Sequence, residues 1–118
     1  LCGYTGAYRE HLRHLVDVLG KAPGANCLAA LNMLVLKKGT FLLADTHVNT
    51  EPSAAEIAEI ALAAAERARR FGMGPRVALL SASNFGTSDD ASALKMREAL
   101  ALVKRSAPAT GVGVRTSV

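Results

Sequence analysis

The stretch RVALLSASNFGTSDD, which spans residues 76–90, constrains the fold of this chain more than any other part of its sequence. It begins with the apolar run 77–80, which follows a Gly-Pro pair, and short apolar runs with such boundaries are typical of buried strands. Residues 81–88 are small, polar and rich in hydroxyl groups, and a helical pattern starts at Asp90. A strand, a polar loop and a helix in this order form the unit with which open α/β sheets present a ligand, because strand ends and helix amino termini converge there.

Apolar periodicity predicts three helices along the chain. Residues 8–19, 53–71 and 90–107 carry apolar side chains at the i, i+3, i+4 spacing of an amphipathic helix. Ser53 and Glu56 form a capping-box sequence at the start of the second helix, where each side chain can accept a hydrogen bond from a backbone N–H of the first turn. Because many apolar positions of this second helix are alanines, we expect it to lie close against a sheet.

Two apolar runs, 25–36 and 41–44, flank a short Lys-Gly turn and predict an antiparallel hairpin. Residues 41–82 have the pattern of a strand, a helix and a second strand, which predicts a βαβ unit with a right-handed crossover. In such a unit the strands at 41–44 and 77–80 run parallel. The fold class that we predict is therefore α/β, a layered domain whose mixed sheet combines a β-hairpin with a βαβ unit.

The length of 118 residues is enough for one domain with its own core. We assign residues 1–108 to the α/β domain, because Pro108 is expected to end the third helix, and residues 109–118 to a divergent or truncated tail. Leu1 is not a methionine, so we expect the chain to be a fragment of a longer protein.

Composition argues against several classes of function. Apolar residues make up 50% of the chain without any run of the about 20 that a membrane span needs, so no membrane protein is expected. The net charge of +4 comes with three Phe, two Tyr and no Trp, which leaves no aromatic and basic surface for nucleic acid. Cys2 and Cys27 are too few for a disulfide framework or a zinc site, and reduced thiols of a cytoplasmic protein are the interpretation that we favour.

Two groups of polar residues outside the loop are candidates for chemistry. His11 and His14 have a spacing that can hold a metal on a helix, but no third ligand follows from the sequence, and we favour surface histidines. Asp45, His47 and Asn49 alternate after a strand and form either a strand-end site or a capped, solvated turn, of which we favour the turn. We therefore predict no metal site in this chain.

The hydroxyl groups of the polar loop can donate hydrogen bonds to phosphate oxygens. The loop contains no G-x-S-x-G sequence, spacing assigns no base or orienting acid, and the chain holds neither a GxGxxG nor a Walker sequence, so we predict no catalytic residue. Asp89 and Asp90 lie at the predicted helix start, where carboxylates favour the helix dipole but repel an anion. We therefore expect a contact at the rim of a ligand and not a tight phosphate cradle.

Three long segments, in this order along the chain, resemble the phosphate acetyl/butyryltransferase family: LLADTHVNTEPSAAEIAEIAL, RRFGMGPRVALLSASNFGTSDD and KMREALALVKRSAP. The resemblance is closer to the carboxy-terminal, phosphotransacetylase-like part of bacterial NADP-dependent malic enzymes, because the opening GYTGAY and the loop SNFGTSD are similar to their versions. Together these segments cover most of residues 3–108. The resemblance implies the second domain of a phosphotransacetylase-like fold.

The resemblance also implies where a ligand binds. In the acetyltransferases, acetyl-CoA and phosphate lie between two α/β domains, and the serine–arginine catalytic segment lies further along than this chain reaches. The family carries an arginine in an LRPAL-like segment, and LRH falls at that place here, so Arg13 is a candidate contact for a phosphate or an acyl phosphate. The other candidate binding residues are those of the polar loop: Ser83, Asn84, Gly86, Thr87 and Ser88.

The function that the resemblance implies belongs to a longer parent protein. Malic enzymes of this type oxidatively decarboxylate malate to pyruvate with NADP and a divalent metal, in an amino-terminal region that this chain does not resemble. The part that it resembles is expected to bind acetyl-CoA or a related acyl-CoA as a regulator, and to help a homo-oligomer assemble with the remainder of the parent chain. The alternatives are a fragment of a phosphate acetyltransferase, which moves acetyl between CoA and phosphate, and an oligomerisation module without a ligand.

Overall fold

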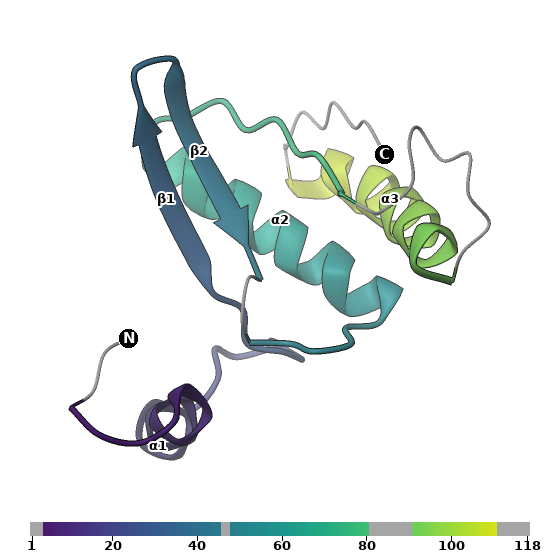
Figure 1. Cartoon of the computed structure of the whole chain (residues 1–118). Coiled ribbons are helices and arrows are strands. Elements are labelled where there is room, and N and C mark those ends of the chain that lie inside the picture. Colours follow the sequence, from purple (N-terminus) through teal and green to yellow (C-terminus); the bar gives the residue numbers. More distant parts are fainter. Residues whose placement is uncertain (1–3, 46–47, 81–90, 111–118) are drawn as a thin grey trace.

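The computed structural model describes residues 4–45, 48–80 and 91–110. Along the chain these residues form α1 (Tyr8–Leu19), β1 (Leu31–Leu36), β2 (Gly39–Ala44), α2 (Ala54–Arg70) and α3 (Ala91–Thr110). The β1–β2 hairpin lies over one side of α2 and α3 packs beside α2, whereas α1 stands apart from both (Figure 1). Helices and a sheet therefore form the layered α/β arrangement that the sequence predicts.

Helix α2 begins where its sequence predicts. Ser53 is the N-cap, the Glu56 N–H donates to Ser53 Oγ at 3.3 Å, and the Ser53 N–H donates to Glu56 Oε2 at 2.8 Å, which confirms the capping box. The helix ends at Arg70, and Gly72 then adopts φ 75°, in the left-handed region that favours glycine. On the exposed side Arg70 donates to Glu66 at 2.7 Å, an ion pair of residues one turn apart.

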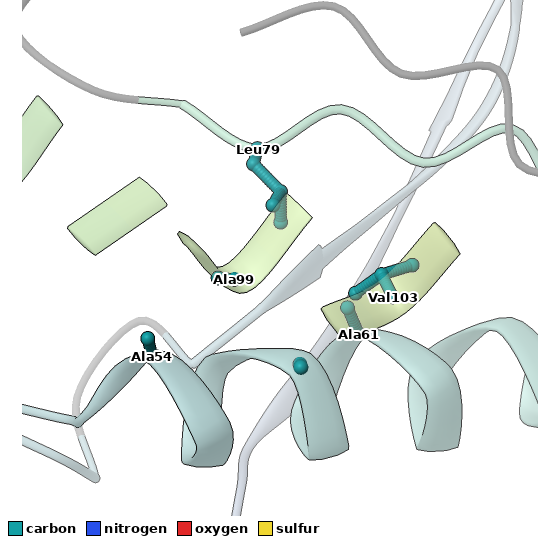
Figure 2. Packing of buried hydrophobic residues seen from close by; sticks show 6 residues of the cluster. Ala54, Ala61, Leu79, Ala99 and Val103 are labelled. Atoms are coloured by element: carbon teal, nitrogen blue, oxygen red, sulfur yellow. The ribbon is translucent and has the colours of Figure 1, made fainter. Parts of the chain in front are cut away.

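The buried core lies where α2, α3 and the segment 77–79 meet. Side chains from these three parts point toward one another, and Ala99 and Val103 of α3 are both 0% exposed (Figure 2). Because an alanine side chain is one methyl group, the two helices can approach closely along this face. The alanine face of α2 therefore packs mainly against α3, and less against the sheet than we expected. The buried members of the cluster are Ala54, Ala58, Ala61, Leu79, Ala99 and Val103.

The predicted hairpin is confirmed, although β1 is shorter than the predicted run 25–36. The two strands pair antiparallel from Leu31 opposite Ala44 to Leu36 opposite Gly39. Residues 25–30 do not belong to β1. Their polar groups form hydrogen bonds with other parts of the chain, since the Asn26 N–H donates to Glu59 of α2 and the Leu28 carbonyl accepts from Asn49.

The predicted third strand is not formed. Burial alternates along residues 73–80, where Val77 is partly buried and Leu79 is 7% exposed, but no ladder of hydrogen bonds joins this segment to the hairpin. Among the described residues the sheet has two antiparallel strands, so the expected parallel pairing of 41–44 with 77–80, and with it the mixed sheet, is absent there. Val77 and Leu79 instead pack against the helices, whereas Ala78 and Leu80 are exposed, so only alternate residues of the apolar run are buried.

Helix α3 is longer than predicted. It continues to Thr110, so Pro108 lies in its last turn and not beyond its end. A proline at this position removes a single backbone donor, and only the last residues of the helix depend on the turn that it disturbs. The predicted boundary of the helix at residue 107 was therefore wrong.

Helix α1 spans the predicted residues but buries little of its apolar side. It ends at Gly20, which has φ 70° and whose N–H donates to the Val16 carbonyl at 2.9 Å. Leu15 is 39% exposed and Leu19 is 76% exposed, although the apolar spacing predicts a buried stripe. Within the described parts of the chain, none of the helices is both long and apolar enough to cross a membrane.

Candidate functional site

Asp45 and Asn49, which follow β2, form a small network of hydrogen bonds. Asp45 adopts φ 56°, and its Oδ1 accepts from Asn49 Nδ2 at 2.8 Å and from the Asn49 N–H at 3.3 Å. Asn49 Nδ2 also donates to the Leu28 carbonyl at 2.8 Å. Aspartate tolerates the left-handed region and caps local backbone, so these two residues form the capped turn that we favoured. His47, the third member of the predicted group, lies outside the described residues.

An open groove of about 360 Å³, here called the corner groove, lies between this turn, α1 and the start of α2. Arg9 of α1 reaches across it, and its Nη2 donates to Thr50 Oγ1. This bond fastens α1 to the chain that leads into α2. The volume is near the lower end of the range for small-molecule pockets. The lining residues are Arg9, Leu12, Val48, Asn49, Thr50, Glu51, Pro52 and Glu56.

Charges of both signs line the corner groove. The backbone N–H and the hydroxyl of Ser53 donate to Glu56 and lower the pKa of its carboxyl, so this side chain is ionised at neutral pH. Glu51 accepts from Lys95 of α3 at 3.1 Å. Two carboxylates beside one guanidinium make a poor cradle for a phosphate group, but they can bind a polar ligand that carries both donors and acceptors.

A second polar cluster joins the chain before β1 to α2. The Asn26 N–H and side-chain amide donate to the two carboxylate oxygens of Glu59, both at 2.9 Å, and Lys21 donates to the Asn26 carbonyl at 2.9 Å. These bonds between Asn26 and Glu59 are here called the clamp. Cys27, which is a free thiol, directly follows Asn26 in the sequence. Burial raises the pKa of the Cys27 thiol, and the nearby carboxylates of Glu59, Glu56 and Asp45 raise it further. A thiol in these surroundings stays protonated and is a weak nucleophile.

The structure describes only one of the predicted binding residues. Arg13 is exposed on α1, one turn after Arg9 and outside the lining of the corner groove. The flanks of the loop are also described. Leu79 anchors the chain in the core just before the loop, and α3 begins at Ala91 just after it. The loop itself, with Ser83, Asn84, Gly86, Thr87 and Ser88, lies outside the described residues.

The sequence analysis did not single out Arg9, although it is the cation that lines the corner groove. The available signal was its position four residues before Arg13, which places both side chains on one face of α1. His14 is exposed, and His11 is partly exposed. Across residues 4–45, 48–80 and 91–110, no three His, Cys, Asp or Glu side chains come together in a way that could hold a metal ion.

Taken together, the fold and the groove define an α/β domain in which a helix pair supports a hairpin and a polar groove opens where β2 leads into α2. The phosphate acetyl/butaryl transferase family matches residues 1–113 of this chain. The chain belongs to that family, which confirms the resemblance found in its sequence.

Relatives within the family carry two different names. The chain is 53% identical over 108 residues to the NADP-dependent malic enzymes of Haemophilus influenzae and Escherichia coli, a match that covers 92% of this chain and 14% of each enzyme. It is 35% identical over 113 residues to the phosphate acetyltransferase of Paracoccus denitrificans, covering 90% of this chain and 36% of that protein. The chain therefore spans a small part of the length of these relatives.

A solved structure has the same fold. The EutD phosphotransacetylase from Staphylococcus aureus matches with a TM-score of 0.76 and 25% sequence identity, over 91% of this chain and 32% of that one. This match confirms the predicted α/β class and its phosphotransacetylase-like character.

Proposed function

We propose that this chain is part of the acetyl-CoA-responsive regulatory and assembly domain of an NADP-dependent malic enzyme. The observation that carries the proposal is the difference in identity, 53% to two malic enzymes against 35% to a phosphate acetyltransferase. In the parent, malate is oxidatively decarboxylated to pyruvate with NADP and a divalent metal by a region outside this chain. The chain alone has no catalytic residue, the parent is cytoplasmic, and it assembles as a homo-oligomer.

The ligand of this domain is acetyl-CoA or a related acyl-CoA, which contacts the loop between Leu80 and Ala91. Two features support this part of the proposal. The chain that leads to the loop is anchored at Leu79, which is buried against the helix pair. Apart from Phe85, most of the loop residues are small and polar, so the amide-rich pantetheine arm finds hydrogen-bond partners there. Arg13 is the cation that we assign to the same ligand. The loop contacts are assigned to Ser83, Asn84, Gly86, Thr87 and Ser88.

The runner-up is a fragment of a working phosphate acetyltransferase, which transfers acetyl between CoA and phosphate. The fold match to a phosphotransacetylase and the family assignment favour it. A third candidate is an assembly module without a ligand. The coding sequence on either side of this chain separates the first two, since a malic-enzyme region upstream supports the proposal and a serine–arginine segment downstream supports the runner-up.

A binding experiment on the full-length parent tests the ligand. The double variant Ser83→Leu/Asn84→Leu is expected to weaken acetyl-CoA binding by roughly fivefold, because a lost contact of this kind with an uncharged ligand contributes on the order of 1 kcal/mol. Isothermal titration calorimetry measures the change. The matched control is Ala101→Leu, an equally apolar addition at an exposed position of α3. If a folded double variant binds acetyl-CoA with unchanged affinity, the loop is not part of the binding site, and the assembly module without a ligand becomes the favoured hypothesis.

A further inference from the structure

Helix α1 is attached to the rest of the described chain by few contacts. Its 12 residues, Tyr8–Leu19, include none that is buried, and it packs extensively on no other described helix or strand. Figure 1 shows it standing apart from α2, α3 and the hairpin. A helix of this length is marginal in water without tertiary contacts. The place of α1 relative to the other elements therefore depends on a small number of side chains.

The side chain of Arg9 makes one of these contacts. Its Nη2 donates to Thr50 Oγ1, an acceptor 41 positions away in the sequence. Leu12 follows Arg9 by three residues and lines the corner groove together with it, so this face of α1 is turned toward the segment 48–52. A hydrogen bond from a guanidinium is stronger than one between neutral groups. The bond from Arg9 to Thr50 thus attaches α1 to the chain that precedes α2.

Thr50 is a well-fixed acceptor, because both of its neighbours in the sequence are bound elsewhere. The side-chain amide of Asn49 donates to the Leu28 carbonyl at 2.8 Å. Glu51 accepts from Lys95 of α3 at 3.1 Å. The chain on either side of Thr50 is therefore tied to distant parts of the domain, and a helix that is bound to Thr50 is held in place relative to them.

We propose that the hydrogen bond from Arg9 to Thr50 is a positioning contact, which holds α1 so that Arg13 can bind the acyl-CoA. This inference rests on the proposed function, in which Arg13 is the cation for that ligand. Arg13 follows Arg9 by four residues on the same face of α1, so a shift of the helix moves both side chains. Arg9 acts through Arg13 and does not itself touch the ligand. A helix that is held before the ligand arrives needs less ordering on binding, which raises the affinity.

Calorimetric titration of the full-length parent with acetyl-CoA tests this role. Thr50→Val keeps the shape of an exposed side chain but removes the acceptor, and the dissociation constant is expected to rise roughly threefold to tenfold. Thr50→Ser keeps the hydroxyl group and should retain the wild-type value. Thr40→Val is the matched control, because it makes the same exchange at an exposed position of β2, and it should leave the dissociation constant unchanged.

A double-mutant cycle separates positioning from a general loss of structure. When Arg13→Ala is already present, Thr50→Val should have no further effect on the dissociation constant, because no cation is left to position. A purely structural role of Thr50 would instead weaken binding by the same factor with and without Arg13. Equal factors in the two backgrounds would therefore overturn the proposal.

Amide hydrogen exchange of the parent without ligand tests the attachment of α1 by itself. Thr50→Val should speed exchange in residues 8–19 and leave exchange in α3 as it is in the wild type. Unchanged exchange in α1 would show that the bond does not hold the helix, and would overturn the positioning role.

The titrations also distinguish a failure of this proposal from a failure of the proposed function. If the wild-type parent does not bind acetyl-CoA, or if Arg13→Ala binds it as the wild type does, the assigned binding site is wrong and the positioning role falls with it. If Arg13→Ala weakens binding and Thr50→Val does not, the binding site stands and the positioning role alone is overturned.

Discussion

The α2–α3 layer and the hairpin use apolar residues in opposite ways. In the described chain the buried residues lie on α2, on α3 or at Leu79, and most of them are alanines. The hairpin carries the larger Leu, Met and Phe side chains, and several of these are about half exposed. Small side chains allow close helix packing but bury little apolar area each. Close packing and high apolar content are therefore separate properties. In this domain the α2–α3 layer is closely packed, whereas the hairpin carries the larger apolar side chains.

The largest effect on stability is expected from a charged residue introduced into the α2–α3 layer. Val103→Asp places a carboxylate at a position that is 0% exposed, and the free energy of unfolding is expected to fall by about 4 kcal/mol or more. Val18→Asp, at a residue of α1 that is 81% exposed, should change it by less than about 0.5 kcal/mol. Urea unfolding followed by circular dichroism measures both. Similar losses in the two variants would mean that α1 packs as tightly as α3.

Overpacking of the same layer should have an intermediate effect. Ala99→Leu adds three carbons where the side chain is 0% exposed, and we expect a loss of about 1–3 kcal/mol because the helices must move apart. Ala101→Leu makes the same change two residues further along, at an exposed position, and alanine and leucine have similar helix propensities. Thermal unfolding of the two variants separates packing from propensity. Equal melting temperatures would show that the alanine contact is not tight.

The smallest expected effect concerns the start of α2. Ser53→Ala removes the N-cap acceptor and should lower the free energy of unfolding by about 1 kcal/mol at neutral pH. Hydrogen bonds from Ser53 lower the pKa of Glu56 below its ordinary 4.5, so the fold favours the ionised carboxylate. That contribution is present above the unfolded-state pKa and is lost as pH falls through the lower folded-state pKa. The difference in the free energy of unfolding between Ser53→Ala and wild type should therefore become smaller in acid. A difference that stays constant with pH would show that Ser53 does not stabilise the ionised form of Glu56.

Local features of the fold were predictable from the sequence. The capping residues of α2, the Lys-Gly turn of the hairpin and the length of α1 each depend on a few neighbouring residues, and the structure confirms them. The partner of the 77–80 run was not predictable, because an apolar run indicates burial but not what buries it. Val77 and Leu79 pack on helices here. In the same way, the apolar stripe of α1 indicates a helix but does not supply a neighbour for it.

The candidate site could be predicted less completely. The favoured interpretation of Asp45 and Asn49 as a capped turn rests on their preference for backbone hydrogen bonds, and the structure agrees. The corner groove was not foreseen, because it forms between α1 and the lead-in to α2, which lie about 40 residues apart in the sequence. The binding role of Arg13 stays a prediction, as do the roles of Ser83 and the other loop residues.

The clamp between Asn26 and Glu59 has a consequence for local unfolding. Its two hydrogen bonds join residues 33 positions apart, and the loop that they close contains the whole hairpin. Once a loop of this length is closed, the strands keep their place over α2 with little further loss of chain entropy. The clamp thus ties the chain before β1 to α2, and we expect its loss to weaken the attachment of the hairpin to α2 more than the packing of α2 against α3.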